Sequence, residues 1–217
     1  MNIASHVEHT LLKSEANVQD IIKLCQEAVD YKLFGVCVNP CYVALAKHLL
    51  TKSQVQVVTV IGFPLGANLT AIKAAEARAA VSDHADEVDM VMNIGAFKSG
   101  NYGAVVEDIR AVVAAATPQP VKVIIETCLL TDAEKARATQ LVAQGGAQFV
   151  KTSTGFGSGG ATVHDVEILR REATAAGIGV KAAGGIRDRA LALELLQAGA
   201  DRLGTSAGPQ LVRNDDE

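Results

Sequence analysis

The sequence has little of what several protein classes depend on. Tryptophan is absent, and aromatic residues make up only 4% of the 217 residues. Lysine and arginine number 20 against 24 aspartates and glutamates, and the resulting net charge of −4 argues against a general nucleic-acid-binding surface. No apolar run approaches the roughly 18 residues that a membrane-spanning helix needs. We therefore expect no nucleic-acid partner and no membrane association.

Paired cysteines and an obvious metal-ligand set are also missing. Cys25, Cys37, Cys41 and Cys128 include no CxxC pair, and CVNPC lacks histidines at the spacing of a zinc site. The N-terminal stretch MNIASHVEHTLLK has no apolar core of the kind found in secretory signals. These features predict a cytoplasmic protein with reduced thiols and no bound metal.

Aliphatic residues supply the packing, in short runs that alternate with longer ones. Hydrophobic residues make up 49% of the chain, which suits buried parallel strands covered by alanine-rich helices. The short runs predict eight strands: HVEHTLL (6–12), FGVCVNP (34–40), VQVVTVIGFP (55–64), EVDMVMNIG (87–95), VKVIIETCLL (121–130), QFVKTSTG (148–155), GVKAAGG (179–185) and DRLGTSAG (201–208). The amphipathic runs predict helices over residues 18–31, 42–51, 69–84, 102–116, 132–144, 163–176 and 189–197.

This alternation predicts a closed (β/α)8 TIM barrel, with residues 1–217 forming a single domain. An open, doubly wound sheet is the alternative, but such a sheet usually has a glycine-rich turn after its first strand. Here the glycines follow the sixth, seventh and eighth strands instead. Thr131 followed by Glu134 is a capping-box pattern at a helix start, and the final NDDE (214–217) is expected to form a solvated tail.

The alternation of side chains along a strand predicts which charged residues face the inside of the barrel. In the strand 87–95, Asp89 falls on the face opposite the all-apolar set. A carboxylate inside a barrel needs a partner, so Asp89 is either half of a core ion pair or a catalytic group. Lys122 faces inward near the start of the next strand, where we expect a structural role and a pairing with Glu126 or Glu8.

Two lysines occupy equivalent positions on consecutive strands. Lys151 in FVKTSTG and Lys181 in GVKAAGG both fall on the inward face, near the end where barrel enzymes place their sites. Neighbouring strands lie about 4.8 Å apart, so the two amines can come close together. Burial and a nearby like charge lower the pKa of a lysine from about 10.4, and a neutral amine can attack a carbonyl. The pair indicates Schiff-base chemistry; the alternative is a lysine that reaches water or binds an anion.

Small residues gather after the same strands. Gly155 follows the sixth strand, Gly184 and Gly185 follow the seventh, and GTSAG ends the eighth. Barrels often bind phosphate with the loops after strands seven and eight and a short helix. SAGPQLV predicts that helix, with Ser206 as its cap and as a phosphate ligand. Beside the paired lysines, these features indicate a phosphorylated carbonyl substrate, while Arg187 either adds charge or is solvated.

The motifs EVDMVMNIGA, KVIIETCLL, VKTSTGF, KAAGGIR and GTSAG resemble, in order and spacing over nearly the whole chain, those of the deoxyribose-phosphate aldolase family. The resemblance implies a class I barrel aldolase without metal or other cofactor. It implies cleavage of 2-deoxy-D-ribose 5-phosphate to D-glyceraldehyde 3-phosphate and acetaldehyde, in deoxynucleoside breakdown. It also implies that Lys151 forms the Schiff base, Lys181 lowers its pKa and Asp89 is the acid and base. The positions that match the family's phosphate site are Gly155, Gly184, Gly185 and Ser206.

The chain departs from the family pattern in places. Phe156 stands where some relatives have a lysine, which removes one cation from the phosphate end. Glu8 stands where many relatives have aspartate, and its effect on the proton relay or on Lys122 is left open. The C-terminal tyrosine of some relatives is absent. Cys37 faces either the barrel interior or the helices, and a homodimer through the outer helices is our expectation for the assembly.

Other classes of function stay open at this point. A different class I aldolase or an isomerase would share the lysines and the glycine-rich loops. A non-catalytic sugar-phosphate binder would bind the same ligand without forming an imine. Zinc-dependent aldol chemistry is disfavoured, because the histidines form no obvious ligand set. They are His6, His9, His48, His84 and His164.

Overall fold

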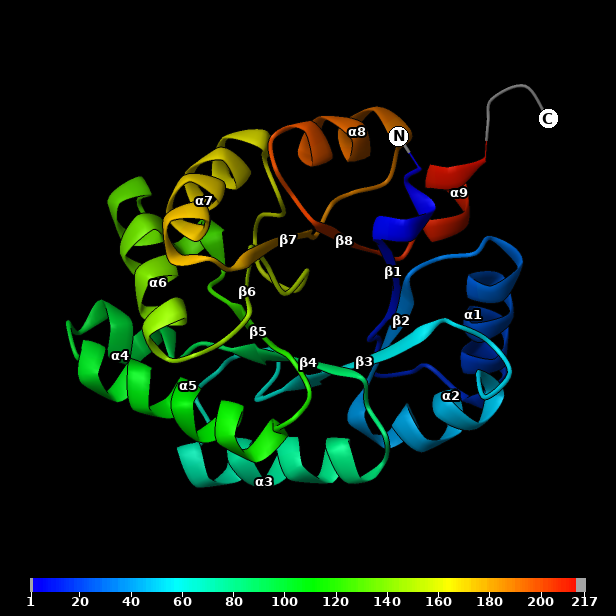
Figure 1. Cartoon of the computed structure of the whole chain (residues 1–217), viewed down its shortest axis with the longest axis horizontal. Helices are drawn as coiled ribbons and strands as arrows, with labels where there is room; N and C mark the ends of the chain where they lie inside the picture. Colours follow the sequence, from blue (N-terminus) through cyan, green and yellow to red (C-terminus); the bar gives the residue numbers. More distant parts are fainter. Residues whose placement is uncertain (1, 214–217) are drawn as a thin grey trace.

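The computed structural model describes residues 2–213, and within them eight parallel strands close into a barrel (Figure 1). The strands are β1 (Val7–Leu11), β2 (Gly35–Val38), β3 (Gln56–Ile61), β4 (Glu87–Val91), β5 (Val121–Ile124), β6 (Phe149–Lys151), β7 (Gly179–Ala183) and β8 (Arg202–Thr205). Each strand pairs with the next along the chain, and β1 pairs with β8 to complete the ring. The (β/α)8 barrel expected from the sequence is confirmed.

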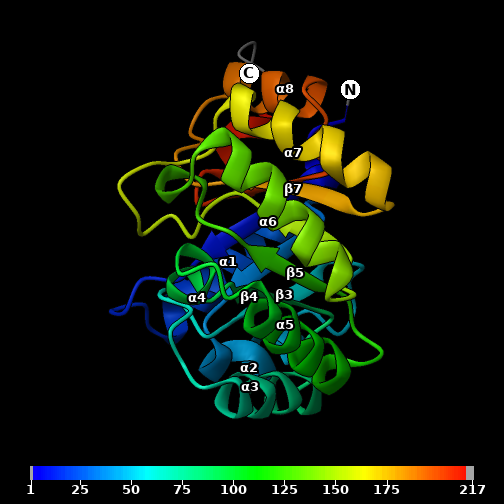
Figure 2. The same cartoon turned by 90° about the vertical axis from the view of Figure 1, so that its left-hand side faces the viewer.

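Helices connect the strands and lie on the outside of the barrel, as the side view in Figure 2 shows for α5, α6 and α7. The α-helices are α1 (Val18–Asp30), α2 (Val43–Leu49), α3 (Thr70–Ser82), α4 (Ile94–Lys98), α5 (Tyr102–Ala116), α6 (Asp132–Gln144), α7 (Val163–Ala176), α8 (Arg189–Gln197) and α9 (Gly208–Val212). The short 3-10 helices are η1 (Ala4–His6), η2 (Pro40–Tyr42) and η3 (Thr127–Leu129). The seven helices expected from periodicity are present with small shifts at their ends. The five-residue α4 was not expected, because one short turn carries no periodic signal.

Local signals account for several of these boundaries. At the start of α6, the Glu134 N–H donates to Thr131 Oγ1 and the Thr131 N–H donates to the Glu134 carboxylate, which is the predicted capping box. Gly177, with φ +72°, ends α7 in the left-handed conformation that glycine adopts without strain. The solvated tail predicted for 214–217 lies outside the described residues. Among the helices that the structure describes, none is both long and apolar enough to cross a membrane.

Apolar residues form two clusters that the strands separate. The larger cluster fills the layer between strands and helices and includes Val88 and Met90 of β4. The smaller one comprises Leu12, Cys37, Val58 and Val60, with Phe63 packed against it. Because successive side chains of a strand point to opposite sides, the placement of Val88 and Met90 toward the helices leaves Asp89 pointing into the barrel. The inward orientation expected for Asp89 is confirmed.

A buried ion pair links α3 and α5 to the carboxyl end of β4. Lys73 Nζ lies 2.6 Å from Asp108 Oδ2 and donates to the Val91 carbonyl at 2.9 Å, while Thr70 Oγ1 donates to Asp108 Oδ1 at 2.8 Å. The side chains of Lys73 and Asp108 are 0% and 4% exposed. The pair therefore holds two outer helices against the strand that carries Asp89.

Replacing Asp108 with alanine is expected to lower the free energy of unfolding by about 3 to 5 kcal/mol, because the Lys73 ammonium group would remain buried without its partner. Urea unfolding of the variant measures this loss. Asp83→Ala, at an exposed position next to the end of α3, is the matched control and should change stability by less than about 0.5 kcal/mol. Equal, small effects of both changes would contradict the role assigned to the Lys73–Asp108 pair.

Candidate active site

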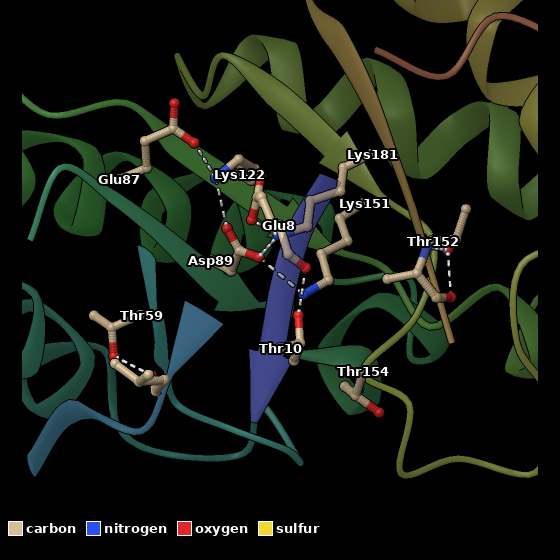
Figure 3. Close-up of polar contacts among 12 residues, drawn as sticks. Glu8, Thr10, Thr59, Glu87, Asp89, Lys122, Lys151, Thr152, Thr154 and Lys181 are labelled. Atoms are coloured by element: carbon tan, nitrogen blue, oxygen red, sulfur yellow. Dashed lines mark hydrogen bonds and ion pairs between the residues drawn. The ribbon is translucent and has the colours of Figure 1, made fainter. Parts of the chain in front are cut away.

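Charged side chains from five strands meet inside the barrel (Figure 3). They are Glu8 of β1, Glu87 and Asp89 of β4, Lys122 of β5, Lys151 of β6 and Lys181 of β7. All six residues are buried. Three carboxylates thus face three amines, and the cluster is electrically neutral when all six groups are ionised. Neutrality matters here because an unpaired charge inside a protein is strongly destabilising.

Asp89 lies at the centre of this cluster. Its Oδ2 accepts hydrogen bonds from Lys151 Nζ at 2.8 Å and Lys181 Nζ at 2.6 Å, and its Oδ1 accepts one from Lys122 Nζ at 2.9 Å. Burial alone would raise the pKa of Asp89, but the charges of the three lysines outweigh burial and hold this pKa well below its usual value. Asp89 is therefore ionised at neutral pH, and its Oδ2 lies between the two amines that the sequence placed side by side.

Lys181 and Lys122 each contact more than one carboxylate. Lys181 pairs with Glu8 as well as Asp89, and although burial lowers its pKa, these two charges raise it above the usual value. Lys122 Nζ lies 2.5 Å from Glu87 and 3.5 Å from Glu8, and its pKa is likewise raised by its three carboxylate neighbours despite burial. Both amines therefore remain charged at neutral pH.

The expected pairing of Lys122 with Glu8 is present, but the alternative pairing with Glu126 is wrong. Glu126 has φ +55°, so the chain has already left the regular strand at this residue and the strand alternation no longer applies. Its carboxylate accepts hydrogen bonds from Thr154, at the far end of the site from Lys122.

Lys151 is the lysine of the cluster that reaches a cavity. This cavity has a volume of about 340 Å³ and lies at the carboxyl end of β1, β6, β7 and β8. Lys151 contributes to its lining, whereas Lys122 and Lys181 do not. A carbonyl compound in the cavity would therefore meet the Lys151 amine first, with the Asp89 carboxylate directly behind it.

The residues predicted to bind phosphate also line this cavity. Gly155, Gly184 and Gly185 have φ values of +85°, +86° and +77°, a conformation that other residues adopt only with strain. Arg187 lines the same cavity, and so does Lys13, which the sequence reasoning missed. Lys13 directly follows the EHTLL motif. Its position just after a barrel strand was the sequence feature from which its place at the cavity could have been predicted. No carboxylate is among the described residues that line the cavity, so its charge favours an anionic ligand.

Ser206 lines the cavity, but the helix-capping role expected for it is wrong. The residue that caps α9 is Ala207, without a side-chain bond. The Ala207 N–H donates instead to Thr205 Oγ1 at 2.9 Å, and this hydroxyl donates to the Ile186 carbonyl at 2.6 Å. Because the Thr205 hydroxyl binds the Ala207 N–H at this turn, the exposed Ser206 side chain is not needed there and can bind a ligand.

Comparison with known proteins bears directly on this arrangement. A family model described as "DeoC/LacD family aldolase" matches residues 4–214. The chain belongs to this family. A deoxyribose-phosphate aldolase of Thermococcus gammatolerans is 54% identical over 216 residues, covering 98% of this chain and 96% of its own. One from Carboxydothermus hydrogenoformans is 54% identical over 215 residues, covering 97% and 94%.

Solved structures of this aldolase family share the fold closely. A putative deoxyribose-phosphate aldolase from Coccidioides immitis superposes with a TM-score of 0.95 at 41% identity, covering 97% of this chain and 84% of its own. The deoxyribose phosphate aldolase from Aeropyrum pernix, described as a tetramer, gives 0.91 at 34% identity, covering 97% and 89%. The chain is thus an aldolase, a carbon–carbon lyase, and the family resemblance drawn from its motifs is confirmed.

The structure shows where the residues that depart from the aldolase family pattern lie. Glu8 contacts Lys181 inside the cluster, so the longer carboxylate still reaches an amine. Phe156 lines the cavity, and its ring packs on Phe63. Cys37 faces the barrel interior rather than the helices, and burial raises the pKa of its thiol to about 11. Within residues 2–213 no group of three or more His, Cys, Asp or Glu side chains is arranged to hold a metal ion.

The lowered pKa of Asp89 predicts a pH-dependent contribution to stability. Its ionised form stabilises the fold above the unfolded-state pKa of about 3.9, and this contribution is lost as the pH falls through the lower folded-state value. Asp89→Asn should therefore lower the free energy of unfolding by about 3 to 5 kcal/mol near pH 7.

The difference between wild type and Asp89→Asn should shrink as urea unfolding is repeated at pH values below about 4. Asp83→Asn, at an exposed position, serves as the control and should leave the curve unchanged. A gap between wild type and Asp89→Asn that stays constant from pH 7 to pH 3 would show that Asp89 is not held in its ionised form.

Proposed function

We propose that this chain is a class I aldolase that reversibly cleaves 2-deoxy-D-ribose 5-phosphate to D-glyceraldehyde 3-phosphate and acetaldehyde, through a Schiff base on Lys151. The observation that carries the proposal is one buried amine that both contacts Asp89 and opens on a cavity rich in cations. The relatives at 54% identity, which are deoxyribose-phosphate aldolases, support the same substrate. No metal or other cofactor enters the proposed reaction.

Imine formation is the first step. The Lys151 nitrogen attacks the C1 aldehyde carbon of the substrate, and the resulting carbinolamine loses its hydroxyl as water to give an iminium ion. The positive charge then resides on the same nitrogen that carried it in the ammonium group. Asp89, 2.8 Å from this nitrogen and fixed by two further lysines, is placed to stabilise the iminium without reorganising.

Carbon–carbon cleavage follows from the iminium. A base removes the C3 hydroxyl proton, the C3 oxygen forms the new aldehyde, and the C2–C3 electron pair moves toward nitrogen to give an enamine. The enamine takes a proton at C2, and water hydrolyses the imine to release acetaldehyde and the free amine. We assign the proton transfers to Asp89 and Lys181, which share a hydrogen bond of 2.6 Å; transfers of this kind contribute about 10²- to 10⁴-fold each.

We assign the phosphate group to the glycine-lined end of the cavity. Gly155, Gly184 and Gly185 present backbone at the surface of the cavity, and the exposed Ser206 adds a hydroxyl. Arg187 and Lys13 line the same cavity as Phe156 and supply positive charge to it.

We further propose the context in which this enzyme works. Its partner is a small sugar phosphate, its place is the cytoplasm, and its pathway is deoxynucleoside breakdown. A single domain over residues 1–217 is part of this proposal, and the pairing of β1 with β8 supports it because the first and last strands complete the same sheet. A homodimer through the outer helices is the proposed assembly, while the relative from Aeropyrum pernix is described as a tetramer.

Borohydride reduction in the presence of 2-deoxy-D-ribose 5-phosphate should attach a stable adduct to Lys151, which mass analysis of peptides will locate. Lys151→Ala should abolish the adduct, because no other amine of the cluster reaches the cavity. Lys52→Ala, at an exposed position, is the control and should trap substrate like the wild type. Undiminished trapping by Lys151→Ala would end the assignment.

Lys181→Leu should lower kcat by about 10²-fold or more. The reason is that the substitution removes the amine that shares the 2.6 Å hydrogen bond with Asp89 and to which we assign the proton transfers. Steady-state rates of cleavage of 2-deoxy-D-ribose 5-phosphate measure the loss. A kcat close to that of the wild type would contradict the role of Lys181.

A further inference from the structure

We propose that Glu126 is a positioning residue for the phosphate end of the Lys151 cavity and that it acts by holding the loop after β6. The inference rests on the proposed function, which assigns the phosphate to this end. Glu126 follows β5 and is 4% exposed, whereas the loop, residues 152–162, connects β6 to α7. Glu126 does not line the cavity, but Thr154 and Gly155 of the loop do. An effect of Glu126 on substrate binding therefore passes through the loop.

The backbone of Glu126 directs its side chain to this loop. Its φ of +55° and ψ of +70° lie in the left-handed region, which residues other than glycine seldom adopt. The Thr154 hydroxyl donates to Glu126 Oε2 at 2.5 Å, and the Thr154 N–H donates to the same oxygen at 3.3 Å. Unusual backbone conformations persist where the surrounding contacts fix them. The contact between Glu126 and Thr154 therefore belongs to one fixed arrangement of the two loops.

In the part of the chain that the structure describes, the groups that donate hydrogen bonds to the Glu126 carboxylate are neutral. They are the hydroxyl and the N–H of Thr154 and, at 3.9 Å, the thiol of Cys128. The carboxylates of the central cluster, by contrast, each contact a lysine. Glu126 therefore does not balance the charge of a buried amine in this structure, and its carboxylate is used to bind the loop.

Glycines let the loop pack closely on Glu126 and on the residues after it. A Cβ atom at Gly157 would lie 3.1 Å from the carboxyl carbon of Glu126, and one at Gly159 would lie 2.9 Å from Cβ of Cys128. Glycine allows this close approach because it has no side chain. The loop is thus held against Glu126 by packing as well as by the hydrogen bonds from Thr154.

The hydrogen bond to Glu126 also fixes the turn that brings Gly155 to the cavity. The hydroxyl of Thr154 donates to Glu126 and accepts a hydrogen bond from the Phe156 N–H at 3.0 Å. Gly155 lies between these two residues with φ +85°. The carboxylate therefore orients the hydroxyl that closes the turn around Gly155.

The same loop reaches the turn after β7, which carries the next part of the phosphate end. The Ala161 N–H donates to the Gly184 carbonyl at 3.0 Å, and a Cβ atom at Gly160 would lie 2.2 Å from that oxygen. A shift of the loop would therefore displace Gly184 as well as Gly155. Glu126 thus supports two of the residues that we assign to the phosphate.

This support matters because a loop that is already in place loses less conformational entropy when it binds a ligand. Without the Glu126 carboxylate, the N–H and hydroxyl of Thr154 lose their acceptor and the loop is free to move. The affinity for phosphate should then fall. The Lys151 amine should keep its reactivity, because it is held by Asp89 rather than by the loop.

The experiment compares Glu126→Ala and Glu126→Gln with the wild type. The alanine variant should raise KM for 2-deoxy-D-ribose 5-phosphate about tenfold or more, with a much smaller change in kcat, and the glutamine variant about threefold, because it keeps one acceptor oxygen. The Kd of inorganic phosphate, measured by calorimetry, should rise in the same order. Borohydride trapping of acetaldehyde on Lys151 should match the wild type, since acetaldehyde has no phosphate. Glu167→Gln, at an exposed position on α7, is the control and should leave all three quantities unchanged.

A double variant tests whether Glu126 acts through Thr154. Thr154→Val removes the hydroxyl and keeps the shape of the side chain. Because the two changes remove the same hydrogen bond, the rise in KM of the double variant Glu126→Ala, Thr154→Val should be smaller than the product of the two single rises. A rise equal to that product would contradict the assigned route.

Unchanged KM and phosphate affinity in Glu126→Ala, in a protein that unfolds at the wild-type temperature, would overturn the inference. If the alanine variant does not fold, unchanged values in Glu126→Gln overturn it in the same way. A loss of acetaldehyde trapping as large as the loss of phosphate affinity would also overturn it, because the damage would then be general. A wild type that binds phosphate but does not cleave 2-deoxy-D-ribose 5-phosphate would overturn the proposed function alone, since the phosphate affinities still test Glu126.

Discussion

The carboxylate of Asp89 is shared by three lysines inside the barrel, and this sharing determines how the remaining charged groups are arranged. Each of these lysines would be strongly destabilising inside the protein if it stood alone. Asp89 contacts Lys122, Lys151 and Lys181, and Glu8 and Glu87 bring the number of carboxylates to three. The closed barrel makes the arrangement possible, because parallel register sets Asp89 beside Lys122 and Lys151 beside Lys181.

The three lysines have different roles, which follow from the number of carboxylates that each contacts and from which of them lines the cavity. Lys122 and Lys181 are bound by several carboxylates and stay charged, so they fix the position and the ionisation of Asp89. Lys151 has one carboxylate partner and faces the cavity. Lys151 is therefore the amine that can lose a proton and bind the carbon of a substrate. The iminium ion that results carries the same positive charge as the ammonium group, so the net charge of the cluster does not change.

The sequence predicted those parts of the site that depend on regular strands. Asp89, Lys151 and Lys181 were placed inside the barrel by the alternation of side chains, which holds as long as β4, β6 and β7 are regular. The rule failed at Glu126, where the chain turns with a positive φ. It also gave no hint that Asp89 would separate the two amines, because the lengths and bends of long side chains are set by packing.

Contacts between loops that are far apart in the chain could not be predicted from the sequence. The capping role assigned to Ser206 failed because the neighbouring Thr205 hydroxyl binds both the turn and the Ile186 carbonyl. Lys13 was missed because it comes to the cavity only when β1 closes on β8. The closure of the barrel leaves no periodic pattern in the residues just after a strand.

The most direct test of the shared carboxylate is a titration of the Asp89 side-chain carboxyl carbon by NMR, with the signal assigned by comparison with Asp89→Asn. The three lysine contacts predict a midpoint well below the usual value of about 3.9, or an ionised signal that persists until the protein unfolds in acid. A midpoint at or above about 3.9 would contradict the account, because it would mean that the lysines do not hold the charge on which the site is built.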